Sequence, residues 1–463
     1  MSRPVRLRVS GNHRDLLSAH LFPPDGFEAV AFALCGRHRS AEFDVLLVQE
    51  VILIPYDECR VRTPDRVVWS TQRIELMLFR ARQEHLGIVK FHSHPGGYGN
   101  FSAIDDESDR AFFENITSWL CDDLPHASVV MVPGGRMVGR VLSDEREFAP
   151  LERIVVAGHD IEVAASPSAA PIRRHAERHA QLFGEATTRM LGSLRIGVVG
   201  CSGTGSFVVE LLGRLGVQAL VLVDADHVEH RNLNRIVNAT LEDAEIGRPK
   251  VDVLARAVRG MGTGTEVFTI PALLETREAV SALASCDIVF GCVDTHSGRR
   301  TLNRLADFYV LPYIDCGVGL NPDGVGGISQ VCAAAHYVQP GGASLLQRGA
   351  INQNTADAQA LKQTDPDEYA KRRAQNYIPD VEVVSPAVAS INMLASALAV
   401  NEMIARLHPY RNRGNSASSV RFSLSIMHVY LDRYEVTERS RDVGRGDVSP
   451  LLDMPALAAG WGW

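Results

Sequence analysis

Residues Leu194–Gly216 have the sequence LRIGVVGCSGTGSFVVELLGRLG, and this stretch decides the fold of the larger part of the chain. An apolar strand is followed by a glycine-rich turn and by a helix over Gly205–Gly216. Gly200, Gly203 and Gly205 let backbone N–H groups approach a phosphate at the helix N-terminus. The stretch therefore predicts a nucleotide site.

Downstream of this turn, apolar strands continue to alternate with helices. The segments are ALVLVDAD (219–226), CDIVFGCVD (286–294), LPYIDCGVG (311–319) and the apolar helix SPAVASINMLASALAVNEMI (385–404). This alternation predicts an α/β, Rossmann-like domain with a mostly parallel sheet and helices on both faces. Asp224 follows Gly200 by 24 residues, a spacing that fits a ribose-binding acid. The glycine spacing is GxxGxG, so a dehydrogenase is the weakest alternative.

Three further segments carry a family resemblance: DADHVEHRNLNRIV (224–237), IGRPKVD (246–252) and GCVDTHSGR (291–299). With them the chain resembles the ThiF/MoeB and ubiquitin-activating-enzyme family over about residues 173–435. The resemblance implies ATP and Mg²⁺ as cofactors, with Asp224, Asn232, Arg235 and Lys250 at the nucleotide and Asp294 on Mg²⁺. Adenylation attacks an α-phosphate, so cations are wanted beside the triphosphate.

The same family uses an arginine that the dimer partner supplies from an N-terminal helix. In ERHAQLFGEA (177–186) this position falls on Arg178, six residues before Gly184. The resemblance therefore implies a homodimer through the adenylation domain.

Many ubiquitin-activating enzymes carry a nucleophilic cysteine before the last apolar helix, but residues 337–384 contain none. Cys316 and Cys332 precede this segment in apolar runs, and we interpret them as core residues. The enzyme either hands its acyl-adenylate directly to an acceptor, or a hydroxyl such as Ser385 or Ser344 forms an oxyester. For Ser385 the alternative is a helix N-cap before Pro386.

A second chemical site is predicted in KFHSHPGGYGNFSAIDD (90–106). His92 and His94 end a strand, and residues i and i+2 of a strand point to the same side. Ser102 suits the N-cap of the next helix and would hold Asp105 in its first turn. Two histidines and one aspartate make three ligands for Zn²⁺ and leave a fourth position for water.

The string HSHP-x6-S-x2-D resembles the JAMM (Mov34/MPN-type) metalloprotease motif, and the resemblance covers about residues 10–150. It implies an α+β domain that cleaves peptide or isopeptide bonds after the C-terminal glycine of ubiquitin-like proteins. A glutamate early in the domain serves as general base. Glu28 in GFEAVAFALCGR fits that place, and Glu50 is the alternative. By resemblance Ser102 stabilises the oxyanion.

We therefore predict a zinc peptidase domain over 1–160, a linker over 161–172 and an adenylation domain over 173–463. The net charge of -8 argues against nucleic-acid or membrane-surface partners, and no apolar run spans a membrane. The N-terminus has no apolar signal region, so we expect a cytoplasmic protein.

The leading hypothesis is a bifunctional enzyme of a bacterial ubiquitin-like modification pathway. One domain would trim or remove a ubiquitin-like protein, and the other would adenylate its C-terminal glycine for transfer to a conjugating enzyme. Two alternatives stay open: activation of a ThiS/MoaD-like sulfur carrier, and a non-catalytic scaffold that binds a ubiquitin-like fold.

Overall fold

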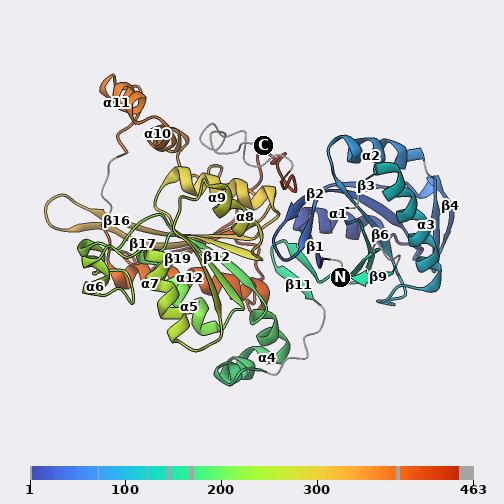
Figure 1. Cartoon of the computed structure of the whole chain (residues 1–463), viewed down its shortest axis with the longest axis horizontal. Coiled ribbons are helices and arrows are strands. Elements are labelled where there is room, and N and C mark those ends of the chain that lie inside the picture. The colour runs from blue at the N-terminus through green and yellow to red at the C-terminus, as the bar shows by residue number, and fades with distance from the viewer. Residues whose placement is uncertain are drawn as a thin grey trace. The chain divides into compact units, whose positions relative to one another are not determined.

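The computed structural model describes residues 3–70, 72–121, 124–142, 147–165, 172–381 and 386–447. They form two compact units (Figure 1). The first unit takes the described residues of Met1–Pro167, Asp307–Val310 and Ser440–Pro450, and the second takes Ser168–Ala306 and Leu311–Arg439. Within the described parts of the chain, no helix is long and apolar enough to cross a membrane.

Among the described residues, the first unit contains a nine-stranded sheet in the spatial order β11-β10-β1-β3-β2-β6-β7-β8-β9. Its strands are β1 (Val5–Ser10), β2 (Val30–Arg39), β3 (Asp44–Leu53), β6 (Gly87–Ser93), β7 (Ala127–Met131), β8 (Met137–Leu142), β9 (Phe148–Pro150), β10 (Arg153–Ala157) and β11 (Ile161–Ala165). Strands β4 (Cys59–Thr63) and β5 (Arg66–Trp69) form a separate hairpin. Its helices are α1 (Gly11–Leu21), η1 (Tyr56–Glu58), α2 (Gln72–Gln83) and α3 (Ala103–Leu120).

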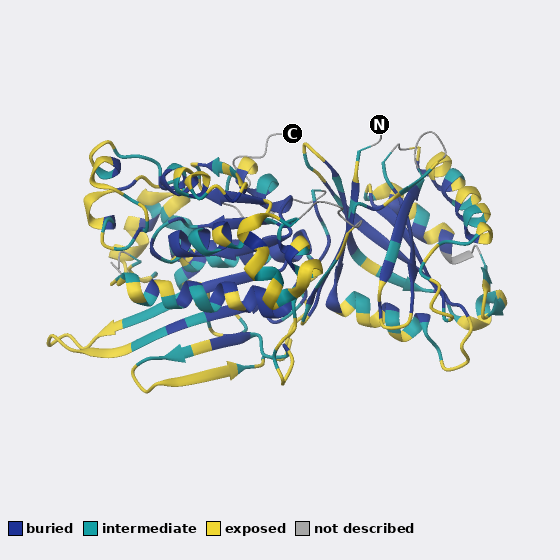
Figure 2. Cartoon of the chain, turned by 90° about the horizontal axis from the view of Figure 1, so that it is seen from below, coloured by how far each residue is buried: buried dark blue, intermediate teal, exposed yellow. Residues whose placement is uncertain are grey.

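Alternation along β2 explains why helices cover both faces of this sheet. Ala31 and Ala33 belong to the apolar cluster that also holds buried leucines of α1. Phe32 and Leu34 point the other way, into the cluster with the apolar residues of α2 and α3. The central strands are accordingly buried on both sides (Figure 2). The expected α+β layout of this region matches what the structure shows.

The second unit is built on an eight-stranded sheet of described residues, in the order β14-β13-β12-β15-β16-β17-β18-β19. The strands are β12 (Arg195–Val199), β13 (Ala219–Val223), β14 (Glu266–Ile270), β15 (Ile288–Gly291), β16 (Tyr313–Pro322), β17 (Ile328–Val338), β18 (Ser419–Ser423) and β19 (His428–Asp432). The helices are η2 (Arg174–Ala176), α4 (Glu177–Leu191), α5 (Gly203–Leu215), η3 (His230–Asn232), α6 (Leu241–Glu245), α7 (Lys250–Gly260), α8 (Arg277–Ala284), α9 (His296–Phe308), α10 (Gln353–Thr364), α11 (Pro366–Ala374) and α12 (Ala389–Leu407).

This sheet is mixed, whereas the sequence predicts a mostly parallel one. Strands β14, β13, β12, β15 and β16 pair in parallel, as a Rossmann-like fold requires, but β16 to β19 are antiparallel. The cause is local. Asp323 Oδ1 accepts hydrogen bonds from Val325 N and Gly327 N in a tight turn, which reverses the chain directly from β16 into β17.

The structure also differs from the predicted segment boundaries. Ile161–Ala165, placed in the linker, forms β11 and pairs antiparallel with β10. Residues 166–171 of the predicted linker lie outside the described residues. Near the C-terminus, Asp447 lies with the first unit because its Oδ1 is 3.0 Å from His38 Nδ1. Such a contact between residues far apart in sequence leaves no local pattern.

Candidate functional site

Strand β6 carries the two predicted metal-binding histidines. All seven residues of GIVKFHS are buried, and His94 follows the strand directly. His92 Nε2 and His94 Nε2 lie 3.2 Å apart. His94 Nδ1 lies 2.8 Å from the carbonyl oxygen of Tyr98, which can only accept, so Nδ1 carries the proton and Nε2 presents a lone pair.

Helix α3 brings the third predicted ligand. Ser102 is its N-cap, as the sequence predicts, and Ser102 Oγ accepts from Asp105 N at 3.2 Å. In return Asp105 Oδ2 accepts from Ser102 N and from Ser102 Oγ, both at 2.7 Å. This capping box leaves Asp105 Oδ1 facing His92 Nε2 at 3.0 Å, while Oδ2 lies 3.4 Å from His94 Nε2.

The three donors fit a zinc ion. Among the described residues, His92, His94 and Asp105 form the one group of at least three possible metal-binding side chains whose ligand atoms converge. Ligands arranged tetrahedrally at Zn²⁺ bond lengths of about 2.0–2.1 Å lie roughly 3.3 Å from one another. The two Nε2 atoms lie 3.2 Å apart, and Asp105 Oδ1 lies 3.0 Å from His92 Nε2, both near that value, while Asp105 Oδ2 faces His94. A cation there would also relieve the close approach of two imidazole nitrogens.

Glu28 lies beside these donors, just before β2. Its carboxylate is buried, and Oε1 is 3.8 Å from His94 Nε2. Burial raises the pKa of Glu28 to about 7, against the opposing attraction of His94. The alternative base, Glu50, lies on β3 and pairs with Arg80 Nη1 at 2.6 Å on the surface. Of the two glutamates, the structure brings Glu28 to the histidines.

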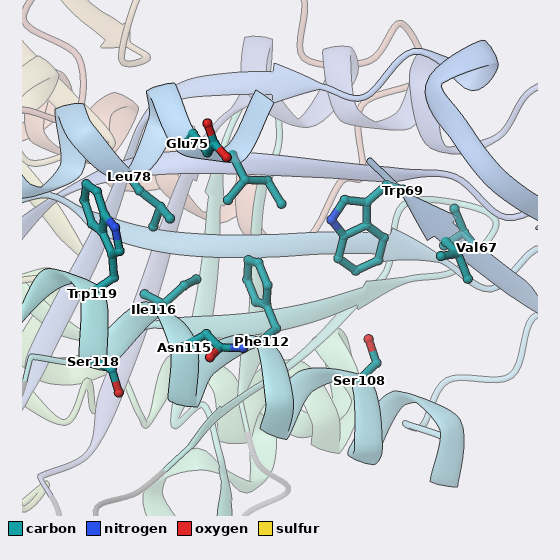
Figure 3. A pocket seen from close by; sticks show the side chains of 12 residues that line it. Val67, Trp69, Glu75, Leu78, Ser108, Phe112, Asn115, Ile116, Ser118 and Trp119 are labelled. Atoms are coloured by element: carbon teal, nitrogen blue, oxygen red, sulfur yellow. The ribbon is translucent and has the colours of Figure 1, made fainter. Parts of the chain in front are cut away.

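Two neighbouring cavities open on this side of the sheet. One, of about 340 Å³, is lined by Glu28, His92 and Asp105 together with residues of the β4–β5 hairpin and α3. The other, of about 640 Å³, lies between α2 and α3 and is largely apolar (Figure 3). Its walls include Trp69, Phe112 and Trp119. Because Trp69 and Ser108 line both, the cavities are adjacent.

In the second unit, the glycine-rich turn connects β12 to α5. Gly200 has a φ of +87°, which glycine adopts without strain. A Cβ on Gly205 would lie 1.8 Å from the carbonyl oxygen of Gly200, and one on Gly203 would lie 2.2 Å from Asn392 Nδ2 of α12. The turn therefore needs glycine at Gly200 and Gly205, whereas a Cβ at Gly203 would displace the side-chain amide of Asn392. The turn leads directly into the N-terminus of α5, where a helix can bind a phosphate.

Asp224 directly follows β13, and its carboxylate faces this turn. Its Oδ2 accepts from Cys201 N at 2.6 Å, and its Oδ1 accepts from Asp226 N at 2.8 Å. Burial raises the pKa of the Asp224 carboxyl. In this structure Asp224 thus braces the turn, and its predicted contact with a ribose remains a prediction.

Two predicted cations lie near the turn. Lys250 is the first residue of α7, is 5% exposed and donates from Nζ to Asp226 Oδ2 at 2.6 Å. Arg235 donates from Nη1 to Arg231 O at 2.9 Å, and its Cδ lies 3.4 Å from where a Cβ on Gly203 would stand. Asn232 Oδ1 accepts from Glu229 N at 3.0 Å, which caps the short helix η3.

The remaining predicted residues are more exposed. Asp294 lies in the loop between β15 and α9. Arg178 lies on α4, which is interrupted where Gly184 has a φ of 79°. Ser344 caps a turn, since its Oγ accepts from Gln347 N at 3.2 Å. Ser385 lies outside the described residues.

The cysteines agree in part with their interpretation as core residues. Cys316 is buried in β16, whereas Cys332 of β17 is only half-buried. Cys332 lies close to the first residues of β17, which are exposed. The sequence analysis also missed Lys90, Asp109 and Arg140, which form a buried ionic cluster next to the metal donors. A lysine inside the otherwise apolar strand GIVKFHS was the available signal.

Comparison with known proteins bears on the second unit. The model of the ThiF family matches residues 176–443, more than half of the chain. The SAMP-activating enzyme E1 of Haloferax volcanii is 33% identical over 130 residues, which are 28% of this chain and 47% of that protein. The molybdopterin-synthase adenylyltransferase of Escherichia coli K12 is 32% identical over 109 residues, 24% of this chain and 43% of that protein.

The chain thus spans less than half the length of these curated relatives. Among solved structures, Escherichia coli MccB with ATP aligns with 57% of this chain and 72% of its own, at 18% identity and a TM-score of 0.43.

Proposed function

Because the chain belongs to the ThiF family, we propose that its second unit adenylates the C-terminal glycine of a ubiquitin-like protein with ATP. The observation that carries this proposal is the glycine-rich turn Gly200–Gly205 with Lys250 and Arg235 beside it. These are the groups that a triphosphate requires: backbone N–H groups at a helix N-terminus and two cations.

In the reaction, an oxygen of the glycine carboxylate attacks the α-phosphorus of ATP. The new O–P bond forms as the bond to pyrophosphate breaks, and pyrophosphate leaves. Lys250 and Arg235 would hold the phosphate oxygens and stabilise their charge in the transition state. The exposed carboxylate of Asp294 offers oxygen ligands that suit Mg²⁺, which supplies further charge neutralisation when bound. Arg178, exposed on α4, would act on the site of a second copy in a homodimer.

The step after adenylation requires a group that accepts the activated glycine. Residues 337–384 contain no cysteine, and the hydroxyl of Ser344 is engaged in a turn. We therefore favour direct transfer to an acceptor that a partner protein provides, either a conjugating enzyme or, as the second candidate, a sulfur donor acting on a sulfur carrier. Ser385 remains the candidate for an oxyester.

The test is ATP–pyrophosphate exchange with purified ubiquitin-like proteins that end in glycine, with mass spectrometry of the partner. A partner–AMP adduct supports activation, and a covalent adduct with the enzyme that resists thiol but yields to hydroxylamine identifies an oxyester. Absence of exchange with every glycine-ended partner would contradict the proposal.

We further propose that the first unit is a zinc-dependent peptidase of the JAMM type that acts on a ubiquitin-like protein. The convergence of His92, His94 and Asp105 carries this proposal. Zn²⁺ held there would supply Lewis acidity. Glu28 would take a proton from the attacking water and deliver it to the leaving amine, and Ser102 would approach the oxyanion once its hydroxyl turns away from Asp105.

The cavity beside Glu28 would hold the scissile bond. The adjoining apolar cavity between α2 and α3 would receive apolar side chains of the protein substrate (Figure 3). Cleavage of a ubiquitin-like precursor should stop in a chelator and return with Zn²⁺. If Glu28→Gln binds zinc and cleaves normally, Glu28 is not the base. A protein that binds the precursor but never cleaves it would be a non-catalytic scaffold.

A further inference from the structure

The buried side of helix α3 begins with acids instead of apolar residues. Its buried positions are Asp105, Asp109, Phe113, Ile116 and Leu120, which lie three or four residues apart and form one stripe. The apolar members join the core with α2 and β2. Polar and ionic contacts, rather than apolar packing, therefore hold the half of α3 that carries Asp105 against the sheet.

Two parallel contacts connect this half of α3 to strand β6. His92 and Lys90 share one side of the strand, because they are two residues apart. Asp105 and Asp109 share one side of the helix, because they are four residues apart. His92 Nε2 faces Asp105 Oδ1 at 3.0 Å, and Lys90 Nζ donates to Asp109 Oδ1 at 2.6 Å. The lysine contact repeats the ligand contact one helical turn further on.

Arg140 of β8 attaches the same turn from the other side. Its Nη2 and Nε donate to Asp109 Oδ2 at 2.8 and 3.2 Å, and Nη1 pairs with Asp106. The guanidinium carbon lies 3.7 Å from the ring centres of both Phe101 and Phe148. Phe101 directly precedes the N-cap Ser102, so Arg140 also braces the chain that enters the helix.

These charges are deeply buried: Lys90 is 2% exposed and Asp109 0%. Apolar side chains in place of all three charged groups commonly stabilise a fold about as well, because burying charge is costly. What apolar packing does not supply is direction. Hydrogen bonds with defined donors and acceptors fix the height and rotation of α3 on the sheet, and the direction of the Asp105 carboxylate depends on both.

We propose that Lys90, Asp109 and Arg140, here called the α3 clamp, are positioning residues that hold Asp105 at the distance from the histidines that a metal ion requires. The inference rests on the proposed zinc peptidase function. Outer-shell partners of metal ligands commonly change metal affinity by about 10- to 100-fold. The clamp acts one turn away from the ligand, through the helix that carries it.

The test measures Zn²⁺ affinity of the full chain by competition with a chromogenic chelator, together with the melting temperature of the zinc-free protein. The key variant is Lys90→Met/Asp109→Leu/Arg140→Met, which replaces all three charged side chains of the clamp by apolar ones. We expect it to fold with a melting temperature near that of the wild type and to bind Zn²⁺ about 10-fold or more weakly. Lys90→Arg should keep affinity within about 3-fold, because it keeps a donor.

The matched control is Glu152→Gln, which weakens another ion pair of the first unit, Arg6–Glu152 at 2.6 Å, and should leave affinity unchanged. If this triple variant does not fold, Arg140→Lys tests the same point, since it keeps the charge and loses the two-pronged contact. Folded clamp variants with wild-type affinity would overturn the clamp alone. A wild-type protein that binds no Zn²⁺ would overturn the peptidase proposal first.

Discussion

The two candidate sites differ in how ready they are for their ligands. In the first unit, the ligand atoms of His92, His94 and Asp105 already converge, and the supporting hydrogen bonds to Tyr98 and Ser102 are in place. In the second unit, Lys250 is paired with Asp226 and Arg235 bonds to backbone, so ATP must exchange these contacts for its own. A small cation needs a rigid site, whereas a large polyanion can reorganise side chains as it binds.

The largest effect on activity is expected when the metal site of the first unit is disrupted. His92→Ala, or a chelator, should lower kcat/KM for cleavage of a ubiquitin-like precursor by about a thousand-fold or more, because Lewis-acid catalysis contributes several kcal/mol. Gel or mass-spectrometric assays of cleavage measure this. ATP–pyrophosphate exchange by the same variant should be unaffected, and a parallel loss of both activities would contradict two separate sites.

A somewhat smaller effect is expected at the nucleotide. Lys250→Ala should lower kcat/KM for ATP–pyrophosphate exchange by about 100- to 1,000-fold, the range for losing one group that stabilises developing charge. Lys371→Ala is the control, since Lys371 is exposed on α11 and pairs only locally with Glu368. Equal exchange rates in the two variants would show that Lys250 has no role in the ATP site.

The glycine-rich turn allows a finer comparison. Gly205→Ala places a methyl group against the backbone carbonyl of Gly200, whereas Gly203→Ala meets the movable amide of Asn392. Overpacking against backbone costs about 1–3 kcal/mol, so Gly205→Ala should weaken ATP binding by roughly 10-fold and Gly203→Ala by less. ATP titrations with melting temperatures measure both, and the reverse order would argue against the described turn.

The smallest expected effect concerns the alternative base. Glu50→Gln removes an exposed pair with Arg80, and we expect less than about a 2-fold change in cleavage, because such surface changes are worth at most ~0.5 kcal/mol. Glu28→Gln should lower cleavage by about 100-fold or more. A large loss in Glu50→Gln with none in Glu28→Gln would reverse the assignment.

Sequence patterns correctly predicted those features of the fold that depend on neighbouring residues alone. The strand before His94, the cap at Ser102, the helix after it and the turn at Gly200 all follow from neighbouring residues, and the structure has each of them.

What escaped prediction depends on contacts between distant residues. Lys90, Asp109 and Arg140 are separated by 19 and 31 residues along the chain, so no periodicity connects them. The pairing of β17 with β18 and the grouping of Asp447 with the first unit have the same origin. Such features become visible only when the fold brings the residues together.

The most direct test of the central claim, two active sites on one chain, is mass spectrometry of a ubiquitin-like precursor with residues beyond its glycine, incubated with the wild-type protein, ATP, Mg²⁺ and Zn²⁺. We expect a trimmed partner that carries AMP, a trimmed partner without AMP in Lys250→Ala, and no trimming in His92→Ala. An untrimmed, unmodified precursor with the wild-type protein, for every partner tried, would contradict it.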